Sequence, residues 1–286
     1  MPEYPEVTIV RKGLESIVNN KTITDVIVIS NKFIKNTTEE NFINFLVNKT
    51  ITKVNNIGKF IEFVFHDNSR MISHLRMEGK YYTRDINLIK DGIREKHDYI
   101  IFILDKNVGL AYNDTRMFGS FEIVEKNDQR SLYEIKNLAQ LPGDVNVDEL
   151  FNKLQRRTKN IKSILLDQSL VLGIGNIYAD ETLHREKVFP MTKCNLISKN
   201  KLQKILNTAQ EIMDQSIQAG GSSVNTYKGV NGKIGTFQNK LFVYGRANSV
   251  CLQCNKENLI KVKLDFKDNG RGTTYCPRCQ KEENVK

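Results

Sequence analysis

Four of the five cysteines form two pairs, Cys251 with Cys254 and Cys276 with Cys279, and each pair encloses two residues. Four thiolates arranged in this way can surround one Zn²⁺ ion tetrahedrally, with Zn–S bonds of about 2.3 Å. A redox or catalytic thiol pair is the alternative, but two matched pairs favour a structural zinc with no open position for catalysis. The stretch between the pairs is slightly longer than the usual span of roughly 15–20 residues. The unpaired Cys194 is expected to be a partly buried thiol.

The N-terminus carries a second possible reaction centre. A methionine followed by proline is normally removed, which would leave Pro2 with a free secondary amine whose pKa is about 8. Such an amine can attack an aldehydic carbon and form an iminium ion. Glu3 and Glu6 share one face of the helix start beside it, where one could protonate an oxygen and the other orient the nucleophile. The alternative is that proline and glutamate are simply favourable first-turn residues.

Polar residues in turns between apolar runs add weaker signals. They are Lys59 after Gly58, the run 74–77, His97 beside Asp98, the run 114–119 and the run 173–176. The lysine could contact a phosphate, the arginine and phenylalanine at 116 and 118 could contact a base, and the amides after residue 175 could bind a phosphate. Taken singly, each is equally explained by packing or by surface exposure.

The apolar pattern indicates a helix followed by strands. Residues 5–17 repeat apolar side chains at helical spacing, and Pro5 suits the first turn. From residue 22 to about residue 124, short β runs alternate with Asn, Gly and Asp clusters, with one helix inserted at 38–46. The β runs are 23–29, 51–54, 59–65, 71–74, 99–104 and 118–124. Short connections between successive strands predict an antiparallel sandwich or barrel.

Helical periodicity begins after the segment QLPGDVNV at 140–147, which is the best linker candidate. Expected helices cover 148–157, 161–167, 176–186 and 198–219, and the glycine-rich stretch 220–240 should be a mobile loop. The predicted fold is a multidomain α+β protein with four parts. These are an N-terminal β-sandwich with a leading helix at 1–139, the linker at 140–147, a helical domain at 148–243 and a four-cysteine zinc finger at 244–286.

Composition narrows the class of protein. The 286 residues include 43 Lys and Arg against 33 Asp and Glu, a formal net charge of +10. This excess favours a polyanionic partner such as nucleic acid, although the abundance of Lys, Asn and Ile typical of AT-rich genomes would also explain it. No apolar run approaches the roughly 18 residues of a membrane span, and residues 1–12 are no signal peptide. We therefore expect a soluble, cytoplasmic protein of two domains, without a membrane partner.

Several short motifs follow one another along the whole chain. They are MPEYPEV at 1–7, GK at 58–59, HLRMEGKY at 74–81, KHD at 96–98, DTRMFG at 114–119, GIGNIYADE at 173–181, QAGGSS at 218–223, VYGR at 243–246 and RGTTYCPRCQ at 271–280. Their ordered co-occurrence resembles the formamidopyrimidine-DNA glycosylase family, bacterial enzymes that repair 8-oxoguanine. The resemblance favours the catalytic interpretation of Pro2 over the structural one.

The resemblance implies a bifunctional glycosylase and AP lyase that removes oxidised purines, 8-oxoguanine and formamidopyrimidines, from double-stranded DNA. It also implies a helix–two-turns–helix, one structural Zn²⁺ ion, a monomer, and DNA bound in a cleft between two domains. Pro2 would attack C1′ of the damaged nucleotide, and Glu3 would open the sugar. Lys59 would assist and bind phosphate, and Arg271 would contact phosphate and serve the second elimination. With Glu6, these residues form the expected catalytic set.

The resemblance further implies a set of DNA contacts. The expected DNA-binding residues are Met77, His97, Arg116, Phe118, Arg157 and Asn176. Met77, Arg116 and Phe118 match a wedge that fills the gap left by the flipped nucleotide, and Asn176 matches a residue that holds the backbone at the lesion. Flipping is needed because C1′ and the damaged base edge are inaccessible within the base stack.

The chain departs from the family pattern at three places. Tyr4 stands where leucine is usual, the zinc-finger excursion is longer, and Gly232–Gly235 replaces a lysine-proline-glycine run in the lesion-recognition loop. The last departure leaves lesion preference open, so an endonuclease VIII-type enzyme for oxidised pyrimidines is the nearest alternative. The motifs MPEYPEV, HLRM and RMF favour the purine enzyme. A non-catalytic zinc-ribbon nucleic-acid binder is the alternative from a different class.

Overall fold

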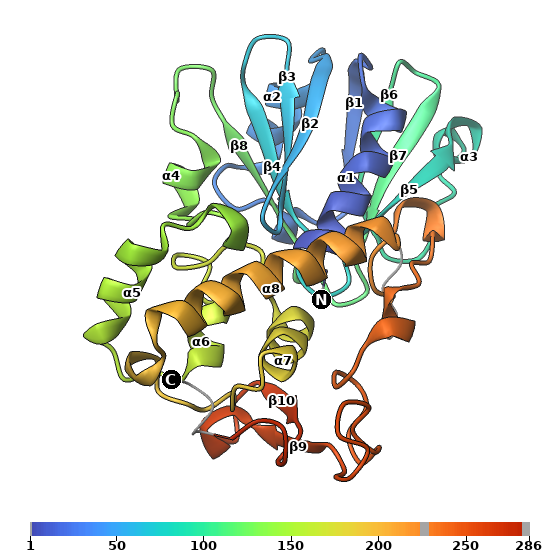
Figure 1. The fold of residues 1–286 in the computed structure, drawn as a ribbon. Coiled ribbons are helices and arrows are strands. Elements are labelled where there is room, and N and C mark those ends of the chain that lie inside the picture. Colours follow the sequence, from blue (N-terminus) through green and yellow to red (C-terminus); the bar gives the residue numbers. More distant parts are fainter. Residues whose placement is uncertain (1, 224–228, 282–286) are drawn as a thin grey trace. The chain divides into compact units, whose positions relative to one another are not determined.

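The computed structural model describes residues 2–223 and 229–281. By its internal contacts the chain divides into two compact units, which Figure 1 shows. Unit 1 comprises Met1–Arg130 with Ala219–Thr236, and unit 2 comprises Ser131–Gln218 with Phe237–Lys286. The segment Ala219–Thr236, which the sequence groups with the helical part, therefore packs with the N-terminal part of the chain.

Unit 1 begins with helix α1, Tyr4–Val18, as the helical spacing predicted. A reciprocal capping box starts the helix: the Glu3 side chain accepts from the backbone of Glu6, and the Glu6 carboxylate accepts from the backbone N–H of Glu3 at 2.9 Å. The buried face of α1 carries Val7, Val10, Leu14 and Val18. Spacing and capping thus agree on where the helix begins and which side it buries.

Two four-stranded antiparallel sheets follow and form a sandwich. The first sheet has the order β1 (Ile23–Val28), β6 (Asp98–Leu104), β7 (Val108–Asn113) and β5 (Lys80–Asp85). The second has the order β2 (Ile51–Ile57), β3 (Phe60–Phe65), β4 (Arg70–His74) and β8 (Ser120–Val124). Side chains from both sheets and from α1 share one core, in which Phe63, Tyr81 and Phe121 are fully buried. The predicted β-sandwich with a leading helix is confirmed.

Strands β5 and β7 were not predicted from the sequence. β5 has Lys80 before its two adjacent tyrosines and Thr, Arg and Asp after them, and Gly109 interrupts the apolar run of β7, so neither shows a clear strand pattern. A Cβ atom on Gly109 would lie 2.2 Å from Cδ1 of Ile89, on the short helix α3 (Ile86–Lys90), so a larger residue there would displace the end of the Ile89 side chain. The inserted helix predicted at 38–46 is α2, Glu39–Leu46, capped by the Thr38 side chain.

Unit 2 is helical in its first part. The predicted helices are α5 (Val147–Gln155), α6 (Ile161–Leu166), α7 (Asn176–Arg185) and α8 (Lys199–Gln218), and a short α4 (Leu132–Lys136) was missed. Asn146 and Asn160 cap α5 and α6, because each side chain accepts a backbone N–H three residues later. The expected linker at 140–147 holds a 3₁₀ turn, Pro142–Asp144.

The cysteine-bearing module ends unit 2. Its strands β9 (Ile260–Lys263) and β10 (Gly272–Tyr275) pair antiparallel. The stretch expected as a loop at 220–240 contains the 3₁₀ turns Val230–Gly232 and Phe237–Lys240, and its residues 224–228 lie outside the described part of the chain. Within residues 2–223 and 229–281, no helix combines the length and apolarity needed to cross a membrane.

Candidate active site, DNA-contact loops and metal-binding cluster

The N-terminal candidates occupy a buried position at the start of α1. Pro2 is buried, and Glu3 and Glu6 are only 2% and 1% exposed. Both oxygens of Glu6 accept backbone N–H groups, Oε2 from Glu3 at 2.9 Å and Oε1 from Ser222 at 2.8 Å. Both Glu6 oxygens are therefore engaged by backbone donors, and the Glu3 carboxylate in turn accepts the backbone N–H of Glu6.

The partner of Glu6 comes from the far end of unit 1. Ser222 follows Gly220 and Gly221, whose φ angles of 78° and 84° are in the left-handed region. A Cβ atom on Gly235 would lie 2.1 Å from the carbonyl oxygen of Gly221. The backbone at Gly235 and the backbone at Gly221 therefore approach each other too closely for a side chain at Gly235. The glycines of the QAGGSS motif therefore bring a backbone amide to Glu6, a role that the sequence did not suggest.

Lys59 stands in the turn between β2 and β3. The preceding Gly58 has φ of 55°, and Lys59 itself is 7% exposed. Asn56, at the end of β2, donates to the Thr8 hydroxyl on α1 at 2.9 Å. The turn that bears Lys59 is thereby held beside the helix whose first residues carry the other N-terminal candidates.

A buried carboxylate shapes the turn that carries Arg116 and Phe118. Asp114 is fully buried, and its Oδ1 accepts the backbone N–H groups of Arg116 and Met117 at 3.0 and 3.1 Å. Its Oδ2 accepts those of Phe118 and Gly119 at 3.0 and 2.9 Å. With four backbone donors on one carboxylate, the turn has a defined shape although its tip is exposed.

The side chains that this turn presents lie together at the surface. The Arg116 guanidinium lies 4.9 Å from the centre of the Phe118 ring, and Phe118 is 51% exposed. Stacking of this kind orients an arginine without consuming its hydrogen-bond donors. The pair is therefore available to contact a ligand.

Tyr112 lies between the turn that carries Met77 and the turn that carries Arg116 and Phe118. A Cβ atom on Gly79 or Gly119 would lie 2.3 or 1.7 Å from the Tyr112 hydroxyl, so that hydroxyl fits between the two turns. Tyr112 also donates to Oδ2 of Asp114 at 3.4 Å, and burial together with that carboxylate raises the pKa of Tyr112 far above its usual value. The turn that carries the half-buried Met77 and the turn that carries Arg116 and Phe118 therefore meet at the Tyr112 hydroxyl.

The backbone of His97 is hydrogen-bonded to Asp114, the residue that shapes the turn with Arg116 and Phe118. Its carbonyl accepts from the Asp114 N–H at 3.1 Å, and its φ is 71°. The neighbouring Asp98 is buried and accepts from the Arg84 guanidinium at 2.6 and 3.0 Å and from the Asn113 amide at 2.7 Å. The bidentate pair fixes the start of β6, and with it the half-buried His97 ring.

In unit 2, Asn176 and Arg271 are brought together. The Asn176 amide donates to the carbonyl of Gly272 at 2.9 Å, directly after the exposed Arg271. The Lys162 ammonium donates to the same carbonyl at 3.0 Å and forms an ion pair with Asp180 at 2.6 Å. Helices α6 and α7 therefore hold the first residue of β10.

The Lys162–Asp180 pair is fully buried. Burial raises the pKa of Asp180 to about 7 against the lowering effect of Lys162, and the carboxylate also accepts the Thr274 N–H at 3.0 Å. Neither residue was singled out from the sequence. An isolated lysine or aspartate gives no local signal, because the pair forms only when two helices and the β-hairpin meet.

Arg157 lies two residues after the end of α5 and is half-buried. Its carbonyl accepts from Cys194 Sγ at 3.4 Å. Cys194 is fully buried rather than partly buried as expected, and burial raises the pKa of its thiol. An inert thiol in the core of unit 2 agrees with the interpretation of the unpaired cysteine.

The four paired cysteines form a cluster fit for a metal ion. Their Sγ atoms all lie within 4.8 Å of one another, with 4.0 Å between Cys251 and Cys279 and 3.8 Å between Cys254 and Cys276. A tetrahedron with Zn–S bonds of about 2.3 Å has sulfur–sulfur edges of about 3.8 Å, so the cluster has the right size. Backbone N–H groups of Lys256 and Glu257 lower the pKa of the Cys254 thiol, whereas burial raises the pKa values of the Cys276 and Cys279 thiols. Binding of a metal ion would require all four to lose their protons.

Comparison with known proteins places these features in a family. The chain matches the formamidopyrimidine-DNA glycosylase N-terminal domain over residues 1–121 and the formamidopyrimidine-DNA glycosylase H2TH domain over residues 139–228. A formamidopyrimidine-DNA glycosylase of Mycoplasmopsis pulmonis is 40% identical over 284 residues, 99% of each chain.

Solved structures agree with the sequence matches. A Lactococcus lactis FPG mutant in complex with DNA containing Fapy-dG has a TM-score of 0.88 and 35% identity, covering 98% of this chain and 100% of its own. A MutM structure with DNA containing carbocyclic 8-oxo-G has a TM-score of 0.87 and 34% identity over the same shares. With both domains matched and identity extending over nearly its full length, the chain belongs to the formamidopyrimidine-DNA glycosylase family.

Proposed function

We propose that this protein is a bifunctional DNA glycosylase and AP lyase that removes oxidised purines from duplex DNA and uses Pro2 as its nucleophile. The observation that carries the proposal is the buried Pro2–Glu3–Glu6 arrangement at the start of α1, in a chain of this family. The relatives in complex with Fapy-dG and 8-oxo-G DNA support oxidised purines as the substrate class.

The chemistry begins with removal of Met1, which exposes the Pro2 secondary amine. Its lone pair forms a bond to C1′, the glycosidic bond breaks with the electron pair leaving on the damaged base, and the proton that the amine nitrogen loses goes to that base. Glu3 gives a proton to the ring oxygen as the sugar opens, which produces an iminium ion between Pro2 and C1′. Glu6 takes no proton in this scheme, because both its oxygens hold the backbone at Glu3 and Ser222.

Strand cleavage follows from the iminium ion. The iminium withdraws electrons, so a proton leaves C2′ and the C3′–O bond breaks with the phosphate as leaving group; a second elimination then breaks the C5′–O bond. We assign phosphate contacts to Lys59 and Arg271, and the second elimination to Arg271 as well. Asn176 supports this assignment by binding the carbonyl directly after Arg271.

The exposed pair of Arg116 and Phe118, together with Met77, is proposed to occupy the space left by the flipped nucleotide. Insertion of side chains into the stack is a general way to stabilise an extruded base. His97 and Arg157 are proposed to contact DNA phosphates. The monomeric state and the cytoplasmic location stay predictions.

We propose that the metal held by the four cysteines is Zn²⁺. The all-sulfur donor set and the spacing of the Sγ atoms suit this ion, and a site closed by four cysteine ligands is structural. When bound, the ion would hold the two knuckles together and so support the β9–β10 hairpin, whose second strand begins beside Arg271. No catalytic step is assigned to it.

Borohydride trapping tests the proposal. The full chain, shown by intact mass to have lost Met1, is incubated with duplex containing 8-oxoguanine opposite cytosine, and borohydride reduces the iminium to a stable crosslink. We expect the crosslink at residue 2 by peptide mapping. Pro2→Gly, which supplies a primary amine, should keep part of the lyase activity while base excision falls sharply.

Two controls separate the alternatives. Lys59→Met should still crosslink at residue 2, whereas a crosslink mapped to Lys59 in the parent protein would overturn the assignment. A duplex containing thymine glycol tests the oxidised-pyrimidine alternative, and faster trapping on that duplex than on 8-oxoguanine would reject the proposed substrate class. A protein that binds both duplexes without trapping on either would be a non-catalytic binder.

A further inference from the structure

A buried histidine lies directly against the cysteine cluster. His184 stands in the last turn of α7 and is 2% exposed, and its Nε2 lies 3.4 Å from the Sγ atom of Cys251, which is fully buried. The two residues are 67 positions apart in the chain. Neither the spacing of the cysteines nor the motifs of the sequence single out this histidine.

The chemistry of a metal-bound cysteine decides the direction of the contact. A cysteine that binds a metal ion is a thiolate and carries no proton, so its sulfur can only accept a hydrogen bond. The ring nitrogen that faces it must then carry the hydrogen, which makes His184 a donor through Nε2–H. Hydrogen-bond partners of this kind hold the ligands of a metal ion in position. Their loss commonly weakens binding of the metal about 10- to 100-fold.

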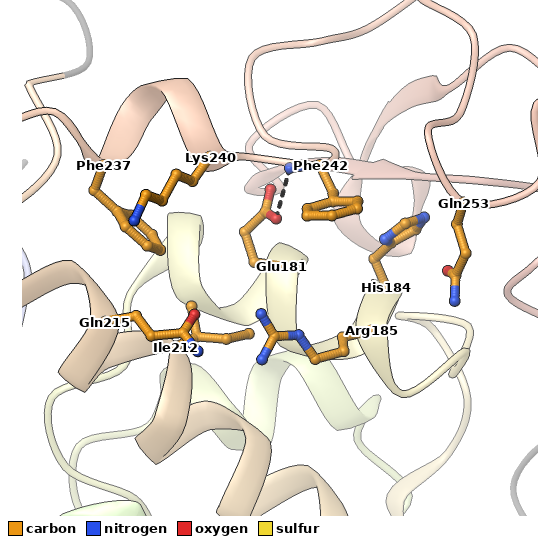
Figure 2. Close-up of a pocket in the computed structure, with 9 residues that line it drawn as sticks. All are labelled: Glu181, His184, Arg185, Ile212, Gln215, Phe237, Lys240, Phe242 and Gln253. Atoms are coloured by element: carbon orange, nitrogen blue, oxygen red, sulfur yellow. Dashed lines mark hydrogen bonds between the residues drawn. The ribbon is translucent and has the colours of Figure 1, made fainter. Parts of the chain in front are cut away.

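The imidazole also lies beside an aromatic ring. Figure 2 shows His184 beside the Phe242 ring at the wall of a cavity of about 410 Å³, and the two ring centres are 6.2 Å apart. Glu181, one turn earlier on α7, accepts the backbone N–H groups of Phe242 and Val243 at 2.8 and 2.9 Å. The helix therefore positions both the histidine and the chain segment that packs on it.

We propose that His184 is a positioning residue of the metal site, whose Nε2–H donates to the Cys251 thiolate and strengthens retention of the metal ion. The inference rests on the proposed zinc content of the cluster. His184 acts through Cys251 and takes no part in the reaction at the damaged nucleotide.

The experiment compares zinc affinity in four full-length proteins. His184→Phe keeps a ring against Phe242 and removes the donor, while His184→Gln places an amide N–H near the position of Nε2. Tyr178→Phe is the matched control, because it removes a buried hydrogen bond (Tyr178 to Ser216, 2.7 Å) from the same helix without touching a cysteine. Zinc content is measured by elemental analysis, and affinity by competition with a chromophoric chelator.

We expect about 10- to 100-fold weaker zinc binding in His184→Phe, near-parental binding in His184→Gln, and parental binding in Tyr178→Phe. Alkylation of Cys251 by iodoacetamide in the zinc-loaded protein, followed by peptide mass, should be faster in the phenylalanine variant because its thiolate has lost a donor. If His184→Phe does not fold, His184→Met provides the donor-free variant.

Three outcomes would overturn the inference. Parental zinc affinity and alkylation rate in a zinc-loaded His184→Phe protein would show that the contact does nothing for the metal. Equal weakening in Tyr178→Phe would show that the effect is general destabilisation of α7. A parental protein that takes up no zinc would reject the zinc proposal itself, and it is distinguished from the first outcome by the elemental analysis.

Discussion

At the scale of single residues, some carboxylates bind backbone N–H groups, while other side chains near them are the ones proposed to act on DNA. Glu6 uses both carboxylate oxygens to hold backbone amides, whereas Glu3 is the proposed acid. Asp114 likewise serves the backbone, with four N–H groups on one buried carboxylate, and leaves ligand contact to Arg116 and Phe118. Residues that touch DNA in the proposal are thus supported by residues that do not.

The two glutamates should separate catalysis from stability. Glu6→Gln replaces an acceptor oxygen with an amide group that faces a backbone donor, so we expect a loss of about 1–3 kcal/mol in the free energy of unfolding. Glu3→Gln should lose less stability but slow single-turnover excision by about 10²–10⁴-fold, the usual contribution of a general acid. Urea denaturation and quench-flow excision measure the two effects, with Glu15→Gln on the same helix as control. Equal loss of stability in both variants would contradict the division of roles.

Arg116 should decide which base opposite the lesion is accepted. Its guanidinium offers only donors, and the pairing edge of cytosine offers two acceptors, whereas adenine offers one acceptor and a donor. Loss of a good base contact costs about 1–3 kcal/mol, so Arg116→Ala should lose its preference for cytosine over adenine. Phe118→Ala should slow excision opposite either base, and Thr115→Ala, at the same exposed turn, should behave like the parent. Full cytosine preference in Arg116→Ala, in single-turnover assays, would refute this role.

At the scale of elements, buried polar groups join segments that apolar packing alone would leave less defined. The Lys162–Asp180 pair and the Asn176 amide hold the start of β10 against α6 and α7, and the Glu181 carboxylate holds the chain that enters the cysteine module. The module is small, so we expect these contacts, together with the proposed metal ion, to contribute much of its stability. The exposed Arg271 depends on them for its position.

Breaking the buried pair should be costly. Lys162→Met leaves Asp180 buried without its partner, and we expect a loss of about 3–5 kcal/mol in the free energy of unfolding. Lys199→Met is the matched control, because its ion pair with Asp148 is exposed and such pairs contribute about 0–1 kcal/mol. A second change, Asp180→Asn, should restore part of the loss in Lys162→Met. Denaturant titration measures all three, and a loss no larger than that of the control would mean that the pair is not a stabilising link.

At the scale of the whole molecule, net charge is the property that bears on binding of a partner. The net charge of +10 suits a polyanionic partner, and phosphate contacts release counterions when DNA binds. Sequence-independent attraction of this kind gives affinity, while selectivity is the role proposed for the turn at Arg116 and Phe118. Binding to damaged and undamaged duplex should therefore fall steeply with salt.

The salt dependence gives a test of individual phosphate contacts. Arg157→Ala should weaken binding to both duplexes and reduce the slope of log affinity against log salt by about one. Arg130→Ala is the control, because that arginine is exposed and already paired with Asp128 at 2.6 Å. Fluorescence anisotropy at several salt concentrations measures the slopes. A slope for Arg157→Ala equal to that of the parent would place this residue away from the DNA.

Much of the fold and of the candidate site followed from the sequence alone, because local patterns carry that information. The two cysteine pairs predicted the metal cluster, helical spacing predicted the main helices to within about two residues, and the alternation of short apolar runs predicted the sandwich. The N-terminal proline and glutamates were compatible with a reaction centre, and only the ordered family motifs favoured that interpretation over a structural one. Each of these signals depends on residues close to one another in the chain.

Only the tertiary structure decided which distant groups meet. Glu6 binds Ser222 across 216 positions, Lys162 reaches Gly272 across 110, and His184 reaches Cys251 across 67. Strands β5 and β7 were not predicted for the same reason. Their polar residues and Gly109 give no strand pattern, and the two strands are defined by pairing with each other and with β6. Hydrogen bonds and ion pairs between remote residues leave no periodic trace in a sequence, because their energy depends on burial and geometry that exist only after the chain has folded.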